Sequence, residues 1–396
     1  MSLIQFAIRQ SFVMCGSGAA AQAPSLLNSM GAKRCVLFTD HVLLHLGLAN
    51  RLASCFQSSG DMTQLVGIFS DVEPDAKCSC INKGLAYFNE VAGDSILVLG
   101  GGSVIDTAKT ILWLKEKGID DVYQMIDNGI VSEFFPTAKR FRMPKIFIPT
   151  TAGTGSEVST TAVIFDERTG IKSALMHQYL GADCALLDPD YTVSLPPKPT
   201  ADSGFDALCH GMEAFFSKKA NEVADSHAIA GMKKVIEYLP VAVKSGDNLQ
   251  AREMMLIGEC LAISAFGQTF GGCPMHNIAH ALGAKYHIAH GDALAVVTPA
   301  VMRCMPEWYL PRIGEFADII GVPRDASAQK CFDRVLHYLD EFREECGLRT
   351  YFADLKVSDA DLKDIIRLVY ADCCDTFYHL PEQIIGHIVA LVAARV

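Results

Sequence analysis

The sequence predicts a chain of two parts, an α/β domain built on a parallel sheet followed by an all-helical domain. From about Lys33 to Leu186, short apolar runs alternate with helical patterns, which is typical of repeated strand, crossover helix and strand units. After the proline-rich segment 195–197 the strand signals vanish. The chain has 396 residues, half of them apolar, and exceeds the size at which a single core usually stops growing. We therefore expect one domain at 1–195 and a second at 196–396.

Three apolar runs define the expected sheet, and each leads into a polar or glycine-rich loop. They cover residues 34–40, 95–100 and 145–149. Open parallel sheets bind ligands at the carboxyl ends of their strands. The loops that follow these runs are therefore candidate ligand sites.

Two of these loops suit a diphosphate. Gly100–Ser103 opens a helix expected to begin near Val104, and glycines let a phosphate approach backbone N–H donors at a helix N-terminus. The loop 149–157 is dense in hydroxyls and glycines. A tight turn and a plain N-capping turn remain the alternatives, since neither loop has the G-x-G-x-x-G or P-loop pattern. Two such loops on neighbouring strands favour a dinucleotide.

Asp40 closes the first apolar run and is placed to accept a hydrogen bond from a ribose 2′-hydroxyl. The same carboxylate would repel the 2′-phosphate of NADP. The sequence therefore favours NAD, although an exposed turn acid is an equally good interpretation of Asp40 alone.

The stretch from 271 to 291 predicts a metal site because it holds four histidines: His276, His280, His287 and His290. Imidazole is the commonest metal ligand, and residues four apart share one helix face, so spacing alone favours His276 with His280. Spacing does not decide which of His287 and His290 is the better candidate ligand, because a loop is expected near Gly283 and would interrupt the helix.

Asp206 and His210 are also four apart, on a helix that Phe205, Leu208 and Met212 mark as buried. A surface ion pair is the alternative. One carboxylate with several imidazoles suits Zn²⁺ or Fe²⁺, and the sequence does not decide between the two ions.

Composition limits the partners and the compartment. A formal net charge of −11 and a pI near 5.5 argue against nucleic acid and anionic membranes. No segment approaches the roughly twenty apolar residues of a membrane span, and Arg9 and Gln10 interrupt any signal-peptide core. The fourteen cysteines are scattered, which is typical of reduced thiols in a cytoplasmic protein.

With these residues in place, the chain resembles the iron-containing, or group III, alcohol dehydrogenases from end to end. Five segments carry the resemblance, namely Gly-Gly-Gly-Ser-Val-Ile-Asp-Thr-Ala-Lys at 100–109, Pro-Thr-Thr-Ala-Gly-Thr-Gly-Ser-Glu-Val at 149–158, Asp-Pro at 188–189, Gly-Phe-Asp-Ala-Leu-Cys-His-Gly-Met-Glu at 204–213, and His-Asn-Ile-Ala-His-Ala-Leu-Gly at 276–283 with His-Gly at 290–291. The resemblance implies a dehydroquinate synthase-like architecture, with a Rossmann-like NAD(P)-binding domain and an all-helical metal- and substrate-binding domain.

The resemblance also implies roles for individual residues. The implied metal ligands are Asp206, His210, His276 and His290, so that His280 stands beside the metal. The implied cofactor-binding residues are Asp40, Gly101, Gly102, Ser103, Asp106, Thr150, Thr151, Thr154 and Lys172. We expect His280 to relay the hydroxyl proton, and His287 to be a bystander or to support a ligand.

Three positions depart from the family pattern. Val104 stands where proline is usual, and Asp75 stands in a segment that often reads Pro-Asn-Pro. Asp292 lies where an asparagine is usual nearby, so we expect altered hydrogen bonding or substrate preference there.

The implied activity is a metal-dependent, NAD-linked alcohol dehydrogenase or aldehyde reductase that acts on a small alcohol or aldehyde, as a homodimer or larger homo-oligomer. The bound metal would act as a Lewis acid on the substrate oxygen. A glycerol dehydrogenase or dehydroquinate synthase-like relative is the first alternative. A non-catalytic NAD-binding or assembly protein on the same fold is the second.

Overall fold

The computed structural model describes residues 11–127, 131–269 and 272–395. Among these residues, those up to Leu195 form one compact unit and those from Pro196 onward form another. Arg9 and Gln10, on which the signal-peptide argument depends, lie outside the described residues, as does Gly271.

The first unit is organised around a six-stranded sheet in the order β1-β9-β6-β4-β2-β3, in which all neighbouring strands are parallel. Its strands are β1 (Phe12–Cys15), β2 (Arg34–Phe38), β3 (Gln64–Phe69), β4 (Ser95–Gly100), β6 (Lys145–Pro149) and β9 (Cys184–Leu187). The predicted runs 95–100 and 145–149 match β4 and β6. The first run ends two residues early, because Asp40 instead caps the following helix by accepting from the N–H of Leu43 at 2.8 Å.

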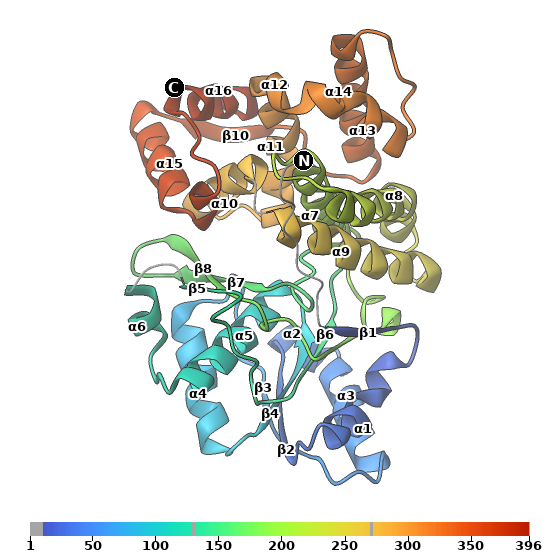
Figure 1. Cartoon of the computed structure of the whole chain (residues 1–396), viewed down its shortest axis with the longest axis vertical. Coiled ribbons are helices and arrows are strands. Elements are labelled where there is room, and N and C mark those ends of the chain that lie inside the picture. The colour runs from blue at the N-terminus through green and yellow to red at the C-terminus, as the bar shows by residue number, and fades with distance from the viewer. Residues whose placement is uncertain (1–10, 128–130, 270–271, 396) are drawn as a thin grey trace. The chain divides into compact units, whose positions relative to one another are not determined.

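Helices cover both faces of this sheet. In Figure 1, α1 and α3 lie on one side of the strands and α4 and α5 on the other. The helices are α1 (Ala23–Ser29), α2 (His41–His45), α3 (Leu48–Ser58), α4 (Cys78–Glu90), α5 (Gly102–Lys117) and α6 (Val122–Asp127), with short 3-10 turns η1 (Ala19–Gln22) and η2 (Pro189–Tyr191). Because side chains alternate along a strand, Leu37 and Leu97 pack with Leu52 of α3. On the opposite face, the Phe38 ring stacks against Phe88 of α4 at 6.3 Å between centroids.

A second, three-stranded sheet completes the first unit. It has the order β5-β8-β7 and consists of β5 (Val131–Glu133), β7 (Thr161–Asp166) and β8 (Ile171–His177). Strands β7 and β8 are antiparallel, whereas β5 and β8 are parallel. Strand β7 of this sheet follows the hydroxyl-rich loop in sequence, so the sheet holds the end of that loop in place.

The second unit is helical, as the sequence predicts. Its helices are α7 (Pro197–Phe215), α8 (Glu222–Lys244), α9 (Leu249–Thr269), α10 (Pro274–Tyr286), α11 (His290–Cys304), α12 (Pro306–Tyr309), α13 (Ile313–Ile319), α14 (Ala328–Glu345), α15 (Asp359–Ala371) and α16 (Glu382–Val392), with 3-10 turns η3 (Leu310–Arg312) and η4 (Cys373–Thr376). Close packing of α8 on α9 depends on Gly231, where an added Cβ would lie 2.8 Å from backbone atoms of α9. One addition was not predicted, a short parallel pair of β10 (Phe352–Val357) and β11 (Ala393–Arg395). Their pairing joins segments about forty residues apart, which local periodicity cannot reveal.

No single helix in the described ranges is long and apolar enough to cross a membrane. Helices α9 and α10 are long and apolar enough when taken together, but their axes differ by 106°.

Candidate metal centre and nucleotide-binding loops

Helix α7 brings Asp206 and His210 to one buried face. Their side chains point the same way because they are one turn apart, and His210 Nδ1 lies 3.7 Å from Asp206 Oδ1. Asp206 is 3% exposed and His210 is 7% exposed. Their burial excludes the surface ion pair that was the alternative for this helix.

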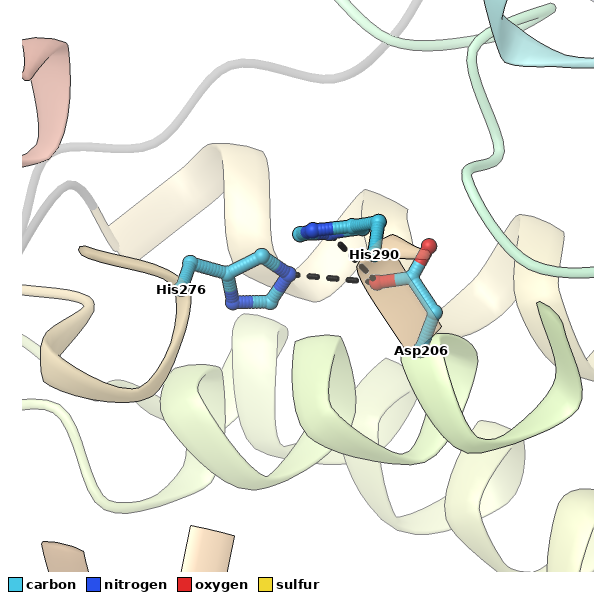
Figure 2. A group of neighbouring side chains, drawn as sticks. All are labelled: Asp206, His276 and His290. Atoms are coloured by element: carbon cyan, nitrogen blue, oxygen red, sulfur yellow. Dashed lines mark hydrogen bonds and ion pairs between the residues drawn. The ribbon is translucent and has the colours of Figure 1, made fainter. Parts of the chain in front are cut away.

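Two further imidazoles reach the same carboxylate oxygen, as Figure 2 shows for His276 and His290. His276 Nε2 from α10 lies 3.2 Å from Asp206 Oδ1, and His290 Nε2 from the first residue of α11 lies 3.6 Å from it. The rings of His210 and His276 stack at 4.6 Å between centroids. The four residues implied as ligands by the family resemblance therefore come together around one oxygen atom.

The electrostatics of this cluster are dominated by burial and mutual attraction. Burial raises the pKa of Asp206, but the surrounding imidazoles, His210 first among them, outweigh burial and hold the pKa well below its usual range. Burial lowers the pKa of His276, yet the carboxylates of Glu213 and Asp206 raise it to about 10. Burial also lowers the pKa of His290, to about 4, despite its contact with Asp206. The carboxylate is thus ionised and the His290 ring is neutral, which are the forms that bind metal ions.

Glu213 completes the cluster and was not singled out by the sequence argument. Its Oε2 lies 2.5 Å from His276 Nδ1, and its Oε1 accepts from the backbone N–H of Met275 at 2.6 Å. Its position seven residues after Asp206 on α7 places the two carboxylates on one helix face, a signal present in the sequence. A carboxylate on the far nitrogen of a histidine is the usual means of orienting a metal-binding imidazole.

The donor set fits a divalent transition metal. It offers one carboxylate oxygen and three imidazole nitrogens, a combination that suits Zn²⁺ or Fe²⁺. Among the described residues, the buried His290 Nδ1 has no hydrogen-bond partner. This nitrogen is a buried polar atom that the protein leaves unpaired within the cluster.

His280 lies beside this cluster and has a different partner. Its Nδ1 is 3.0 Å from Asp372 Oδ2, and its ring is 5.0 Å from that of His290. His280 is 8% exposed. The pairing of His276 with His280 that spacing favoured is therefore replaced by the pairing of His276 with His290 at Asp206.

The loop expected near Gly283 is absent, because α10 continues to Tyr286. The helix ends at His287, which adopts a left-handed backbone conformation with φ 55° and is exposed. The chain then turns so sharply that His290 can begin α11 and face Asp206. This turn, rather than a break inside the helix, separates the histidines.

The two glycine- and hydroxyl-rich loops lie side by side at the ends of β4 and β6. The N–H of Thr150 donates to the carbonyl of Gly100 at 3.1 Å. A Cβ on Gly101 would lie 3.2 Å from the Thr151 side chain, and one on Gly102 would lie 2.8 Å from Thr154. A larger residue at either glycine would press on the threonine side chains where the loops touch.

Helix α5 begins at Gly102, two residues earlier than predicted, and no side chain caps its N-terminus. Its first turn offers backbone N–H groups beside threonine hydroxyls, a combination that suits a diphosphate.

Ser103 and Lys172 are connected through Asp75. The N–H of Asp75 donates to Ser103 Oγ at 3.0 Å, and Lys172 Nζ pairs with the Asp75 carboxylate at 3.0 Å. Asp75 thus occupies the segment in which the family often has asparagine, and it ties Lys172 to the glycine loop.

Asp106 is held by the protein itself. Its carboxylate accepts from the N–H of Val163 at 3.0 Å and from the hydroxyl of Ser156, while Lys109 Nζ lies 3.8 Å away. Burial raises the pKa of Asp106. These contacts clamp α5 to β7 and to the loop that precedes it, which is a positioning role.

Asp292, in the segment that departs from the family pattern, is the buried centre of an ion network whose cations are half exposed. Asp292 pairs with Lys198 Nζ at 2.6 Å and with Arg349 Nε at 3.1 Å. Lys198 also pairs with Asp202 at 2.5 Å, one turn before Asp206 on α7. The network links the start of α11 to α7, so it supports both His290 and Asp206.

Comparison with known proteins matches both units. The model of "Iron-containing alcohol dehydrogenase" matches residues 10–189, and that of "Fe-containing alcohol dehydrogenase family, C-terminal" matches residues 200–394. The long-chain-alcohol dehydrogenase 1 of Geobacillus thermodenitrificans is 31% identical over 355 residues, 89% of this chain and 87% of the relative. The NAD-dependent methanol dehydrogenase of Bacillus methanolicus is 31% identical over 363 residues, 91% of each chain.

Solved structures agree with these sequence matches. A 1,3-propanediol oxidoreductase has a TM-score of 0.87 at 27% identity, covering 98% of this chain and 99% of its own. An alcohol dehydrogenase from Oenococcus oeni has a TM-score of 0.86 at 26% identity, covering 98% and 100%. Together with the family models, these matches show that the chain belongs to the iron-containing alcohol dehydrogenase family.

Proposed function

We propose that this oxidoreductase transfers hydride between a small alcohol or aldehyde and NAD, with one divalent metal bound by Asp206, His210, His276 and His290. Residues 1–195 would bind the cofactor, and residues 196–396 would bind the metal and the substrate. The observation that carries the proposal is the convergence of three imidazoles on Asp206 Oδ1, at 3.2, 3.6 and 3.7 Å.

The metal, Fe²⁺ or Zn²⁺, would supply Lewis acidity toward the substrate oxygen. The protein's part is to orient the ligands. Glu213 does this for His276, since its carboxylate contacts Nδ1 and leaves Nε2 toward Asp206.

His280 is our candidate for moving the hydroxyl proton. Burial raises the pKa of its partner Asp372, but His280 and the N–H of Cys374 outweigh burial and lower it, so Asp372 is ionised. An ionised Asp372 favours the tautomer in which His280 Nδ1 carries the proton. The Nε2 of His280 is then the atom that accepts a proton and passes it on.

The cofactor is proposed to bind at the paired loops, with Gly101, Gly102 and Ser103 at the diphosphate. Thr150, Thr151 and Thr154 line the same loops, and Lys172 would lie on the nicotinamide side. The carboxylate of Asp40 supports NAD over NADP, because it ends the strand next to β4 and would repel a 2′-phosphate.

The surroundings of the metal cluster support a substrate with an apolar part. The ring of Phe266 lies 5.1 Å from that of His210 and 5.5 Å from that of His276, so an aromatic wall adjoins the ligands. The relatives named above act on long-chain alcohols and on methanol, so chain length is not fixed by family membership.

We further propose a homodimer or larger homo-oligomer in the cytoplasm. The edge strand β1 exposes Phe12 and Val13, at 62% and 38%, and an exposed apolar edge strand is a template for pairing with another chain. All fourteen cysteines lie in the described ranges and none of them forms a disulfide there, which supports a reducing compartment.

An aldehyde and alcohol panel tests the proposal. The purified protein, stripped of metal, is assayed with NADH or NAD after addition of Fe²⁺, Zn²⁺ or no metal. We expect turnover only with metal, and at least a hundredfold loss in H276A, since a metal ligand is removed. Turnover of the metal-free protein equal to that of the loaded protein would refute the metal-dependent assignment. Consumption of a cyclisable sugar acid without net NADH would favour the dehydroquinate synthase-like alternative.

A further inference from the structure

The helical unit contains a second cluster of metal-binding side chains, made of His280, Asp372 and Cys374. His280 lies on α10, Asp372 caps the 3-10 turn η4, and Cys374 lies within that turn. One donor atom of each residue lies within 4.8 Å of those of the other two. All three side chains are less than 9% exposed.

The geometry of the cluster matches the spacing that a tetrahedral ion needs. His280 Nδ1 is 3.0 Å from Asp372 Oδ2 and 4.0 Å from Cys374 Sγ. Bonds of about 2.0–2.3 Å to a tetrahedral Zn²⁺ separate neighbouring donor atoms by roughly 3.3–3.8 Å. The observed distances bracket this range, so only small side-chain rotations are needed.

The cluster is anchored by its own backbone. Asp372 Oδ1 accepts from the N–H of Cys374 at 2.8 Å, which leaves Oδ2 directed at His280. Cys273, 4% exposed and directly before α10, lies outside this group of three but hydrogen-bonds Cys374 through its side chain, so it is the candidate for a fourth donor. Two thiols, an imidazole and a carboxylate are a softer donor set than the one at Asp206, which contains no sulfur.

We propose that His280, Asp372, Cys374 and Cys273 form a second metal site, selective for a thiophilic divalent cation such as Zn²⁺ and separate from the site at Asp206. Binding would release the thiol protons and shift the single proton of the neutral His280 ring from Nδ1 to Nε2, giving thiolate, imidazole and carboxylate ligands. The site would therefore fill best at neutral to alkaline pH.

Occupancy of this site would affect His280, and this consequence rests on the proposed function. A cation on Nδ1 confines the single ring proton to Nε2, so the ring can no longer accept a proton there. Zn²⁺ at the second site would then inhibit turnover supported by a metal at the first.

The experiment uses the full-length protein under anaerobic, reducing conditions, titrated with Zn²⁺ against a chromophoric chelator. The wild type is expected to bind two equivalents of Zn²⁺. C374A is expected to bind one, and C346A, which removes another buried cysteine of the same unit, is expected to bind two. Co²⁺ in place of Zn²⁺ should give sulfur-to-metal charge-transfer absorption in wild type and C346A, and weaker or no such absorption in C374A and C273A.

The activity arm uses enzyme first loaded with one equivalent of Fe²⁺. A further equivalent of Zn²⁺ should reduce wild-type turnover at least tenfold and leave C374A within twofold of its own starting rate. Binding of one equivalent by the wild type, or of two by C374A with unchanged Co²⁺ spectra, would overturn the second site. Two equivalents without inhibition would overturn the link to His280 alone. Absence of turnover under every metal condition would instead count against the proposed function and leave the binding result standing.

Discussion

Replacing Glu213 by glutamine tests how far the metal cluster depends on its supporting carboxylate. Both oxygens of Glu213 are in use, one by His276 Nδ1 at 2.5 Å and one by the N–H of Met275 at 2.6 Å. Glutamine is nearly the same size but has a single acceptor oxygen. One of the two N–H donors must then face the amide NH₂, and the negative charge is lost as well.

The magnitude follows from these contacts. A hydrogen bond to a charged group contributes about 1.5–3 kcal/mol, and removing the carboxylate partner of a metal-binding histidine typically costs about 10–100-fold in metal affinity. We therefore expect E213Q to bind Zn²⁺ or Fe²⁺ about 10–100-fold more weakly than wild type, equivalent to roughly 1.4–2.7 kcal/mol. The pKa of His276 should also fall from about 10, because Glu213 is the largest of the groups that raise it.

The assay is a competition titration of the metal-free protein against a chromophoric chelator, with the unfolding temperature recorded in parallel. D225N is the matched control, since it removes a half-buried carboxylate of the same unit that pairs with Arg312 at 2.8 Å. It should cost some stability and leave metal affinity within twofold. The reasoning would be refuted by an E213Q protein that unfolds at the wild-type temperature and binds metal within twofold of wild type.

Three further predictions concern the cofactor, pH and helix packing. D40S keeps a side chain that can cap α2 but removes the charge, so the ratio of kcat/KM for NADH over NADPH should fall at least tenfold; an unchanged ratio would remove Asp40 from the ribose site. With the pKa of His276 at about 10 in the metal-free protein, metal binding must displace a proton, so affinity should rise about tenfold per pH unit between pH 6 and 8, and a flat dependence measured by competition titration would contradict this. A Cβ at Gly291 would lie 2.1 Å from the carbonyl oxygen of Asp202, so G291A should lower stability by about 1–3 kcal/mol or more and weaken metal binding, as chemical denaturation and metal titration would measure. G386A, where the nearest atom would be 3.9 Å away, is its control and should change stability by less than about 1 kcal/mol in either direction.

Much of the fold could be predicted because the sequence patterns that indicate its strands and helices are local. The strands at 95–100 and 145–149 were predicted to the residue, since buried parallel strands are continuous apolar runs bounded by glycine or proline. The change to helices after 195 was visible for the same reason. The β10 and β11 pair was missed because each strand is short and finds its partner far along the chain.

The candidate metal site was only partly open to prediction. The sequence by itself determined that Asp206 and His210 share a helix face, and that four histidines stand within fifteen residues. Spacing makes His276 and His280 equally good candidate ligands, because residues four apart lie on the same face of α10.

Only the tertiary structure separated the histidines. The left-handed turn at His287 reverses the chain so that His290 faces Asp206. The packing of η4 against α10 places Asp372 within hydrogen-bond distance of His280. These contacts join residues 70 to more than 90 positions apart. Local periodicity determines which side chains share a helix face, but only the packing of helices against one another determines what that face meets.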